Sequence, residues 1–580
     1  MKEQIIALLS EALRQLPDLD PETTLPTPSL ERTRDPAFGD FASNVAMQLA
    51  KPLRRAPREI AQAIITALPD NDLIRKAEVA GPGFINLFVN SASTAAIVET
   101  ILAAGEDYGK ATVEPRERVL IEYVSANPTG PLHVGHGRHA AYGATLANLL
   151  RVAGHDVAEE YYVNDAGRQM EILAVSVLVR ALTRADDSAH FPFAGYRGQY
   201  IRDIGEDWRA AHFSTATFDI AELMSSLPED GEDDRKETYI DALIARAETL
   251  LGDQFAVLRQ FAKDAILNDI RDDLAEFGVK PDRFFSEQSL SDDGSIDAAI
   301  DTLQTNDVIY EKAGALWFRT SDFGDEKDRV VVRDNGKKTY FASDIGYHLN
   351  KRQRGFDRLI DVWGSDHHGY IARVRAGMQA MGEAPEHLEV RLVQFVSLYR
   401  GGEKAQMGTR SGNFVTLRAL REEVGNDAAR LFYIMRSNDQ HLDFDLELAT
   451  SKRNENPVYY LQYAHARISN VFDKLDTPDW HPSQGLAHLD RLTEPQEAAV
   501  MTQLARYPEV ILAAAEKRAP NVLINYLRDL ATELHSYYNA HKFMVDDYEL
   551  RDARLVLITA VRQVLRNGFA ILGISAPERM

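Results

Sequence analysis

The sequence of 580 residues contains no cysteine. Disulfide bonds, thiolate zinc sites and cysteine nucleophiles are therefore excluded, and we expect no protein-bound zinc. The sequence also lacks any run approaching about 18 uncharged apolar residues, the length needed to cross a bilayer. The N-terminus opens directly into an amphipathic pattern, without the basic start and apolar run of a signal peptide. These absences predict a cytoplasmic protein without a membrane partner.

Positive charge is in short supply, with 65 lysines and arginines against 88 aspartates and glutamates and a net charge of −23. Taken alone, this balance favours an acidic soluble enzyme over a nucleic-acid-binding protein, because phosphates attract lysine and arginine. Residues 51–58 are an exception, since they hold four basic side chains in eight positions. An RNA-binding face can exist on an acidic protein if the acid lies elsewhere, and its binding should be strongly salt-sensitive.

The length suggests three to four domains of about 150 residues each. Residues 1–112 have the pattern of a small α+β domain. A helix over 1–16 is followed by a proline-rich loop, and further helices are expected near 40–52 and 57–67. Residues 78–89 predict a strand or a hairpin that turns at Gly-Pro-Gly.

Residues 113–425 have the pattern of an α/β domain. Residues 118–125 are mostly apolar, as in a strand buried on both faces, and a long helical stretch ends near Gly154 before the next strand at 156–163. This βαβ unit predicts the start of a parallel nucleotide-binding sheet. A helical, acidic insertion is expected at about 170–290. Later strands are expected to complete the same sheet: 315–320, 329–333 and 358–363.

From residue 426 to 580 the pattern predicts helices only, in a bundle. The expected fold class is therefore α/β. A Rossmann-like catalytic domain would lie between an N-terminal α+β domain and a C-terminal all-α bundle.

Two histidines three positions apart, His133 and His136, mark the junction between the first sheet strand and its helix. Free backbone N–H groups and the positive end of the helix meet phosphates at such junctions, and imidazoles can donate to phosphate oxygens as well. Gly135 between them allows a nucleotide to approach the backbone. We therefore expect all three residues to contact the phosphates of a nucleotide. A metal pair is the alternative, but no third ligand cluster supports it.

The segment His133-Val-Gly-His136 resembles the HIGH signature of class I aminoacyl-tRNA synthetases. The resemblance implies that His133 and His136 are catalytic and that both bind ATP together with Gly135. The wider run from Glu122 to His136 is similar to the arginyl branch of that class. Further arginyl-like phrases extend over the whole chain: Gly39–Asn44, Tyr161–Gln169, Tyr340–His348, Asp427–Leu431 and Ser575–Met580.

The resemblance implies an arginyl-tRNA synthetase, with a class I catalytic domain and a helical anticodon-binding domain that begins with the DALR phrase near Asp427. Such an enzyme uses ATP, with Mg²⁺ in the substrate complex, to convert L-arginine to arginyl-adenylate. It then transfers the arginine to the 3′-terminal adenosine of tRNA(Arg). We expect a monomer.

An arginine pocket needs carboxylates, because the guanidinium is a planar fork of donors that keeps its charge. In the resemblance, Glu122, Ser125 and Asn127 hold the polar head of the amino acid. Tyr340 and Asp344 face the guanidinium, and we expect Asp344 to be its carboxylate partner. The alternatives are a solvent carboxylate at a strand edge for Glu122 and a helix N-cap for Asp344, and the latter could coexist with binding.

Gly364, Asp366 and His367 follow another predicted strand, and the resemblance places this stretch beside the adenosine of ATP. A carboxylate such as Asp366 could bind ribose hydroxyls. His367 and His368 could instead hold a metal. However, adjacent residues on a strand point to opposite faces, which disfavours a joint site.

The second class I signature, KMSKS, is poorly matched at residues 403–413. Gln406 and Thr409 stand where its two lysines should be, and only Met407, which we assign to ATP binding, is identical. No lysine precedes the HIGH signature as a substitute. Arg410 is our catalytic candidate for neutralising the leaving pyrophosphate, with Lys404 as the alternative. Arginyl enzymes as a family need bound tRNA before they activate arginine, and a weak signature loop is an element that tRNA could order.

Phe84 and Asn86 match positions that contact the D-loop of tRNA, where an extruded base can stack and form hydrogen bonds. Tyr459 and Tyr463 in the helical domain are candidates for stacking on anticodon bases. The alternative for each aromatic side chain is a place in the core.

A non-catalytic tRNA-binding protein and a synthetase for another amino acid are the two alternatives to this function. A non-catalytic tRNA-binding relative would explain the degraded KMSKS segment, but the intact His133 and His136 argue against it. A cysteinyl-type synthetase is disfavoured because no cysteine is present to hold its zinc.

Overall fold

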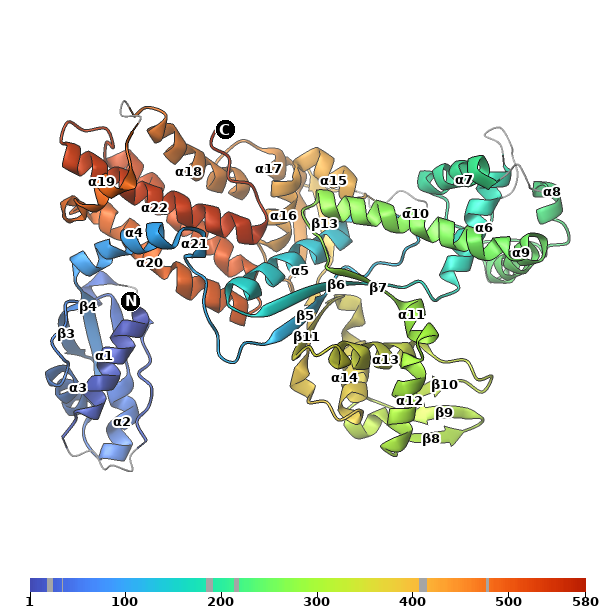
Figure 1. Cartoon of the computed structure of the whole chain (residues 1–580), viewed down its shortest axis with the longest axis horizontal. Coiled ribbons are helices and arrows are strands. Elements are labelled where there is room, and N and C mark those ends of the chain that lie inside the picture. The colour runs from blue at the N-terminus through green and yellow to red at the C-terminus, as the bar shows by residue number, and fades with distance from the viewer. Residues whose placement is uncertain (18–23, 34, 184–190, 213–217, 406–414, 476–478) are drawn as a thin grey trace.

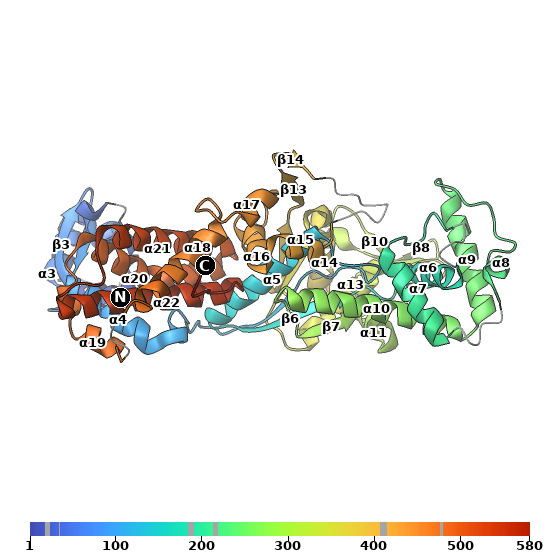
Figure 2. The ribbon, with the colours of Figure 1, turned by 90° about the horizontal axis from the view of Figure 1, so that it is seen from above.

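The structure is a computed structural model of the chain, and it describes residues 1–17, 24–33, 35–183, 191–212, 218–405, 415–475 and 479–580. The molecule is elongated. The N-terminal unit and the helices α6–α9 lie at opposite ends, with the central parallel sheet between them (Figures 1 and 2).

The N-terminal unit is a four-stranded antiparallel sheet, in the order β1-β2-β4-β3, covered by helices. Alternate residues of β4, among them Ile85 and Leu87, are fully buried against α1, α2 and α3, as period-two alternation requires. The predicted hairpin is confirmed, with Gly81 and Gly83 at positive φ in its turn. Its elements are α1 (Lys2–Arg14), β1 (Glu31–Arg32), η1 (Pro36–Phe38), β2 (Phe41–Ser43), α2 (Val45–Leu53), α3 (Pro57–Thr66), β3 (Ile74–Ala80) and β4 (Phe84–Val89).

Helix α4 (Ser91–Ala104) belongs spatially to the C-terminal bundle. Its buried residues Val98 and Ile101 join the large core shared with the bundle and the catalytic sheet, whereas residues up to Val89 form a separate core. In Figure 1, α4 lies along α20 (Pro495–Glu516) and α22 (Tyr548–Leu572). The N-terminal unit therefore ends near Val89 rather than at residue 112, and η2 (Gly105–Asp107) leads on to the catalytic sheet.

The central sheet has five parallel strands in the order β12-β11-β5-β6-β7. The predicted βαβ unit is confirmed, and Gly154, at φ +106°, lies in the turn after the helix. The chain reverses its direction of winding at β5, which lies between β6 and β11. Ligands of such sheets bind in the crevice outside the carboxyl ends of these strands. The elements are β5 (Arg118–Glu122), α5 (Val134–Val152), β6 (Asp156–Val163), β7 (Arg283–Ser286), α13 (Tyr340–Gln353), β11 (Arg358–Gly364), η5 (Ser365–Tyr370), α14 (Ile371–Ala380), η6 (Pro385–His387) and β12 (Leu388–Val393).

The expected helical insertion lies between β6 and β7 and projects from the sheet (Figure 1). It consists of α6 (Gln169–Leu182), α7 (Gln199–His212), α8 (Ile220–Leu223), α9 (Arg235–Leu251) and α10 (Gln254–Glu276).

Two of the predicted strands form, but they do not complete the central sheet. Strands β9 and β10 pair with β8 in a separate antiparallel sheet, and only β11 joins the parallel one. The expectation was wrong because Ala313 and Gly314, both at positive φ, make a tight turn. This turn pairs β9 with the preceding strand β8 as a hairpin, so β9 does not cross over to the parallel sheet. The elements of this part are α11 (Glu287–Asp292), α12 (Ser295–Thr305), β8 (Ile309–Lys312), β9 (Ala315–Phe318), η4 (Thr320–Phe323) and β10 (Arg329–Val332).

The prediction of helices alone after residue 426 was also wrong at one place. Strand β15 (Leu442–Asp445) pairs in parallel with β13 (Val396–Arg400), which also pairs with β14 (Glu403–Lys404). Its alternating buried and exposed residues are typical of a strand. The remaining elements are α15 (Leu417–Val424), α16 (Asn426–Ile434), α17 (Leu446–Thr450), α18 (Pro457–Phe472), α19 (Pro482–Leu486), η7 (Leu489–Arg491) and α21 (Pro520–Ala540), with α20 and α22.

Helix α22 is, among the described residues, the one helix that is long and apolar enough to cross a membrane by length and composition. However, 72% of its most apolar 18-residue window is buried inside the protein. It is a core helix of the bundle, packed against α4, α19, α20 and α21.

The DALR phrase fastens the C-terminus of the chain to the catalytic half. Asp427 accepts hydrogen bonds from the backbone N–H of Ser575, at 3.0 Å, and from its hydroxyl. Arg430 is 1% exposed and donates to the carbonyls of Leu572 and Phe277, each at 3.0 Å. A side chain at Gly573 would meet this guanidinium, so glycine is required there.

We predict that Arg430→Met lowers the free energy of unfolding by about 3 kcal/mol, because two buried carbonyls lose their donor at about 1–3 kcal/mol each. The measurement is the urea midpoint followed by circular dichroism. The control is Arg566→Met, at an exposed position on α22, which should change stability by no more than about 0.5 kcal/mol. Equal shifts of the urea midpoint in the two variants would show that the hydrogen bonds of Arg430 do not stabilise the protein.

Candidate active site

The two histidines of the HIGH signature cap the N-terminus of α5. Nδ1 of His133 accepts from the backbone N–H groups of Gly135 (3.0 Å) and His136 (3.4 Å). Nδ1 of His136 accepts from the N–H of His133 at 3.2 Å, and the two rings stack with centroids 3.6 Å apart. A side chain at Gly135 would run into the His133 ring, which explains the glycine.

This capping arrangement determines which ring nitrogen carries the proton. Because both Nδ1 atoms accept, each neutral ring must hold its proton on Nε2, where it can be donated. Burial lowers the pKa of both histidines, and His133 lowers that of His136 further. The site therefore presents two neutral imidazole donors at the positive end of a helix, an arrangement suited to phosphate oxygens.

The backbone of the HIGH signature pairs with the segment that follows the KMSKS-like region. His133 forms an antiparallel bridge with Thr416, flanked by hydrogen bonds between Leu132 and Leu417 (2.8 Å) and between Val134 and Val415 (3.2 Å). The described chain thus resumes at Val415 directly beside the imidazoles. Met407 and Arg410, which we assigned to ATP binding and catalysis, lie outside the described residues.

The carboxyl end of β5 forms one side of the expected arginine pocket. Glu122 is buried, and its two carboxylate oxygens accept from Lys351 Nζ (2.6 Å) and Ser125 Oγ (2.9 Å). This excludes a solvent carboxylate. Val124 and Ser125 both have positive φ, at +68° and +42°. Such strain in a β-branched residue clusters at functional sites. Asn127 is exposed at the rim.

Helix α13 forms the opposite side of the pocket. It is capped by Thr339, whose hydroxyl accepts from the N–H of Ala342, so the alternative of Asp344 as N-cap is wrong. Tyr340 and Asp344 lie one turn apart on the same face. Tyr340 is 68% exposed, and Asp344 accepts a hydrogen bond from the hydroxyl of Tyr370.

Two carboxyl groups in this pocket have no cationic partner among the described residues. Burial raises the pKa of Asp344 to about 6, and burial together with Asp344 and Asp165 raises that of Glu287 to about 7. Glu287, at the start of α11, is 6% exposed.

The surrounding buried carboxylates, by contrast, each contact a cation. Their pairs are Glu122 with Lys351, Asp361 with Lys351, Asp165 with Lys263, and Glu160 with Arg354. A guanidinium is the kind of group that would complete the pair formed by Asp344 and Glu287.

The expected adenosine residues lie at the carboxyl end of β11. Asp366 and His367 are exposed on η5, and a side chain at Gly364 would collide with the Asp366 carboxylate. His367 and His368 thus lie on a 3₁₀ helix and not on a strand, so the strand argument against a joint metal site does not apply. Burial lowers the pKa of His139 on α5 to about 4, with smaller effects from His133, Asp366 and His367. His139 lies on α5 one turn beyond His136.

No group of three or more His, Asp or Glu side chains within the described part of the chain could hold a metal ion. Mg²⁺ commonly keeps several waters and binds through substrate phosphates.

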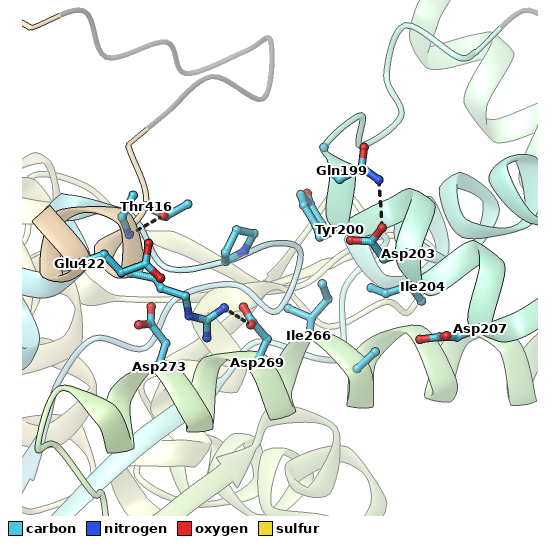
Figure 3. Close-up of a pocket in the computed structure, with 15 residues that line it drawn as sticks. Gln199, Tyr200, Asp203, Ile204, Asp207, Ile266, Asp269, Asp273, Thr416 and Glu422 are labelled. Carbon is cyan, nitrogen blue, oxygen red and sulfur yellow. Dashed lines mark hydrogen bonds and ion pairs between the residues drawn. The ribbon is translucent and has the colours of Figure 1, made fainter. Parts of the chain in front are cut away.

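A cavity of about 570 Å³ lies beside the HIGH signature, between α7, α10 and α15 (Figure 3). Pro131 and Thr416 reach its edge. The charged residues that line the cavity are five acids and one arginine: Asp203, Asp207, Asp269, Asp273, Glu422 and Arg418. Because carboxylates repel phosphates, this cavity is unsuited to ATP or to an RNA backbone.

The structure places the two D-loop candidates on one face of the N-terminal sheet. Phe84 is 37% exposed next to the Gly-Pro-Gly turn, so it is not a core residue. Asn86, two residues further along the same strand, is 4% exposed and pairs between β2 and β3. Phe84 is thus available for stacking, whereas Asn86 offers little surface.

The two anticodon candidates form a half-exposed aromatic ladder on α18. The rings of Tyr459 and Tyr463 stack at 5.9 Å and 7°, and His535 on α21 continues the stack at 5.8 Å from Tyr463. Arg467 lies 3.7 Å from the ring centroid of Tyr538 and donates to His535 Nδ1 at 3.1 Å. Stacked aromatic rings beside a cation are suited to unpaired bases.

Sequence reasoning missed three residues of the site: Glu287, Lys351 and His139. The spacing of His139, one turn beyond His136, could have revealed it, since positions three apart share a helix face. Nothing in the local pattern marks Glu287 or Lys351, because their importance arises from contacts across the sheet.

The parallel sheet, its reversal at β5 and the paired imidazoles on α5 are accompanied by a family match. Residues 97–201 and 235–470 match the family described as "tRNA synthetases class I (R), catalytic domain". Residues 3–89 match the arginyl tRNA synthetase N-terminal domain, and residues 461–580 match the DALR anticodon binding domain. Fold and site thus define a class I aminoacyl-tRNA synthetase.

Similar proteins of known name show which family within this class the chain belongs to. The chain is 54% identical to the arginine–tRNA ligase of Thioalkalivibrio sulfidiphilus and 53% identical to that of Hydrogenovibrio crunogenus, over all of each chain. The chain belongs to the arginyl-tRNA synthetase family. The solved arginyl-tRNA synthetase of Thermus thermophilus has the same fold, with a TM-score of 0.75, 23% identity and full coverage of both chains.

We predict that arginine binding releases protons near pH 6.5. In the free protein, Asp344 and Glu287 are partly protonated at this pH, because their pKa values are raised to about 6 and about 7. A bound guanidinium favours the charged carboxylates, so the protons must leave and the Kd for arginine should fall as pH rises from 5.5 to 8. The measurement is titration calorimetry at pH 6.5 in two buffers of different ionisation enthalpy.

The matched variant is Glu287→Gln, which should lose part of the proton release and weaken arginine binding by roughly 10-fold or more, as the loss of a charge-assisted contact does. ATP binding serves as the control and should stay within about twofold. Tight arginine binding without proton release would refute the assignment of the pair.

Proposed function

We propose that the chain catalyses the ATP-dependent activation of L-arginine and its transfer to tRNA(Arg), with the described pocket as the arginine site. The observation that carries this proposal is that Asp344 and Glu287 have no cationic partner among the described residues, whereas the buried carboxylates around them each contact a cation. A cationic side chain of fixed charge would supply the missing positive group.

At the other end of the pocket, Glu122 would accept from the α-ammonium of arginine, and Ser125 and Asn127 would help to orient the head. Ser125 already holds Glu122 at 2.9 Å. Tyr340 would cover the guanidinium from its exposed position at the start of α13. These contacts leave the arginine carboxylate pointing out of the pocket, toward the α-phosphorus of ATP.

In the activation step, an oxygen of the arginine carboxylate attacks the α-phosphorus in line, and pyrophosphate leaves. Positioning and electrostatic stabilisation carry such a reaction, without a covalent enzyme intermediate. The Nε2–H groups of His133 and His136 would donate to phosphate oxygens, whose negative charge grows in the transition state. Gly364, Asp366 and His367 would bind the adenosine, beside Gly135 and the end of β11.

In the second step, a hydroxyl of the terminal adenosine of tRNA attacks the arginyl carbonyl and AMP leaves. Phe84 in the N-terminal unit would stack on a D-loop base with help from Asn86, and Tyr459 and Tyr463 would stack on anticodon bases. The support is the exposure of Phe84 and the stacking of the two half-exposed tyrosine rings. We further propose that Met407 contacts ATP and that Arg410 neutralises pyrophosphate, and that the enzyme is a cytoplasmic monomer.

We predict that His133→Ala and His133→Asn both reduce adenylate formation by roughly 10²-fold or more, because each removes a donor to developing phosphate charge. Asparagine is a good N-cap, whereas alanine is not, so only the alanine variant should also lose about 1 kcal/mol of stability. The measurement is arginine-dependent ATP–pyrophosphate exchange in the presence of tRNA, together with thermal unfolding. A fully active asparagine variant would show that the imidazole serves only as a cap.

We predict that Tyr459→Leu and Tyr463→Leu each raise the KM for tRNA by roughly 10-fold, because base stacking contributes about 1–3 kcal/mol per base. The KM values for arginine and ATP should not change. The control is Tyr548→Leu, which removes a tyrosine that is 68% exposed at the start of α22. An equal loss in the control would locate the effect outside the aromatic ladder.

A further inference from the structure

Lys351 on α13 is fully buried beneath the proposed arginine pocket. Its exposed fraction is 0%, and its ammonium donates to Glu122 at 2.6 Å and to Asp361 at 2.8 Å. The same ammonium lies 4.2 Å from the ring centroid of Tyr347. A buried lysine is costly unless its charge is fully matched, and here two carboxylates from neighbouring strands match it.

A series of contacts connects Lys351 to Asp344 at the other end of the pocket. Asp361 uses its second oxygen to contact His348 Nε2 at 2.7 Å, and His348 Nδ1 contacts the backbone carbonyl of Asp344 at 2.8 Å. Both ring nitrogens of His348 thus face oxygen atoms, so the ring links Asp361 on β11 to the turn of α13 that carries Asp344.

The spacing along α13 explains how one helix reaches both ends of the pocket. Asp344, His348 and Lys351 occupy positions i, i+4 and i+7, which form one stripe on a helix. Asp344 is thereby placed two turns, or about 10 Å, along the helix axis from the residue that holds Glu122. The carboxylates proposed to contact the two ends of arginine are thus tied to a single rigid element.

We propose that Lys351 is a positioning residue that holds Glu122 at a fixed distance from Asp344, and so matches the pocket to the length of arginine. The inference rests on the proposed function, in which Glu122 binds the α-ammonium. Lys351 touches no substrate in this scheme and acts through Glu122 alone.

Removing the ammonium should change the protonation of the carboxylates around it. The charged and titratable groups that face Lys351 are Glu122 on β5, Asp361 on β11, Glu160 on β6, and Tyr347 and His348 on its own helix. In Lys351→Met, the carboxylates of Glu122 and Asp361 are left without the cation between them. One of them then holds a proton up to a higher pH, and a protonated Glu122 accepts the α-ammonium poorly.

The test measures the Kd of L-arginine and of L-homoarginine, which is one methylene longer, by calorimetry from pH 6 to 8.5. For Lys351→Met we expect arginine binding to weaken by roughly 10-fold or more at pH 6.5 relative to wild type, and by less at pH 8.5, as the loss of a charge-assisted contact does. Its preference for arginine over homoarginine should fall, while the Kd for ATP stays within about twofold.

The matched control is Arg354→Met. Arg354 follows the same helix and pairs with Glu160 through two hydrogen bonds of 2.6 and 2.8 Å, without touching Glu122. This control loosens the same helix, but its arginine affinity relative to wild type should be independent of pH. If Lys351→Met behaves like Arg354→Met, Lys351 has only a structural role and the inference is overturned.

Two further variants separate the inference from the proposed function. Glu122→Gln should itself weaken arginine binding, and adding Lys351→Met to it should cost little more, because the contact is already lost. If Glu122→Gln alone has no effect, the proposed role of Glu122 fails. If the two losses simply add, only the inference fails.

Lys351→Arg keeps the charge if the methionine variant does not fold. We expect it to keep the wild-type pH dependence but to change the ratio of arginine to homoarginine affinity, because the larger cation displaces Glu122. An unchanged ratio overturns the inference.

Discussion

A charge inside a protein must be balanced by an opposite charge or by hydrogen bonds, and this requirement organises the centre of the molecule. Lys351 balances Glu122 and Asp361, while Arg354 balances Glu160. These contacts fasten α13 to three strands of the central sheet. The few carboxyls left without a cation then become meaningful, because the protein tolerates them only where a ligand can complete the balance.

The same rule applies to backbone groups at the interface between the catalytic half and the bundle. Arg138 on α5 is 1% exposed and donates to three carbonyls, those of Gln394, Ser437 and Gln440. These carbonyls belong to the loops around β13 and β15, where no helix or sheet partner is present for them. One arginine beside the HIGH signature thus holds together the loops that flank β13 and β15.

Local patterns in the sequence were sufficient for much of the fold. The βαβ unit, the helical insertion and the hairpin at Gly81–Gly83 depend on periodicity and on turn residues that lie close together in the chain. The fate of β9 and β10, the strand β15 and the packing of α4 on the bundle depend on partners far away. For the site, the family phrases indicated Glu122 and Asp344. They could not indicate Glu287 or Lys351, because which buried charge lacks a partner is known only after the sheet has assembled.

The hydrogen bonds that join Asp427 to Ser575 and Arg430 to Leu572 can form only late during synthesis on the ribosome. Asp427 and Arg430 are made 148 and 142 residues before Ser575 and Leu572, their partners. At about 5–20 residues per second, these two side chains wait roughly 7–30 s for the residues that complete their hydrogen bonds. Docking of the bundle onto the catalytic half must therefore wait until residues 572–575 have left the exit tunnel, and a nascent chain stalled near residue 560 would keep Arg430 without its acceptor on α22.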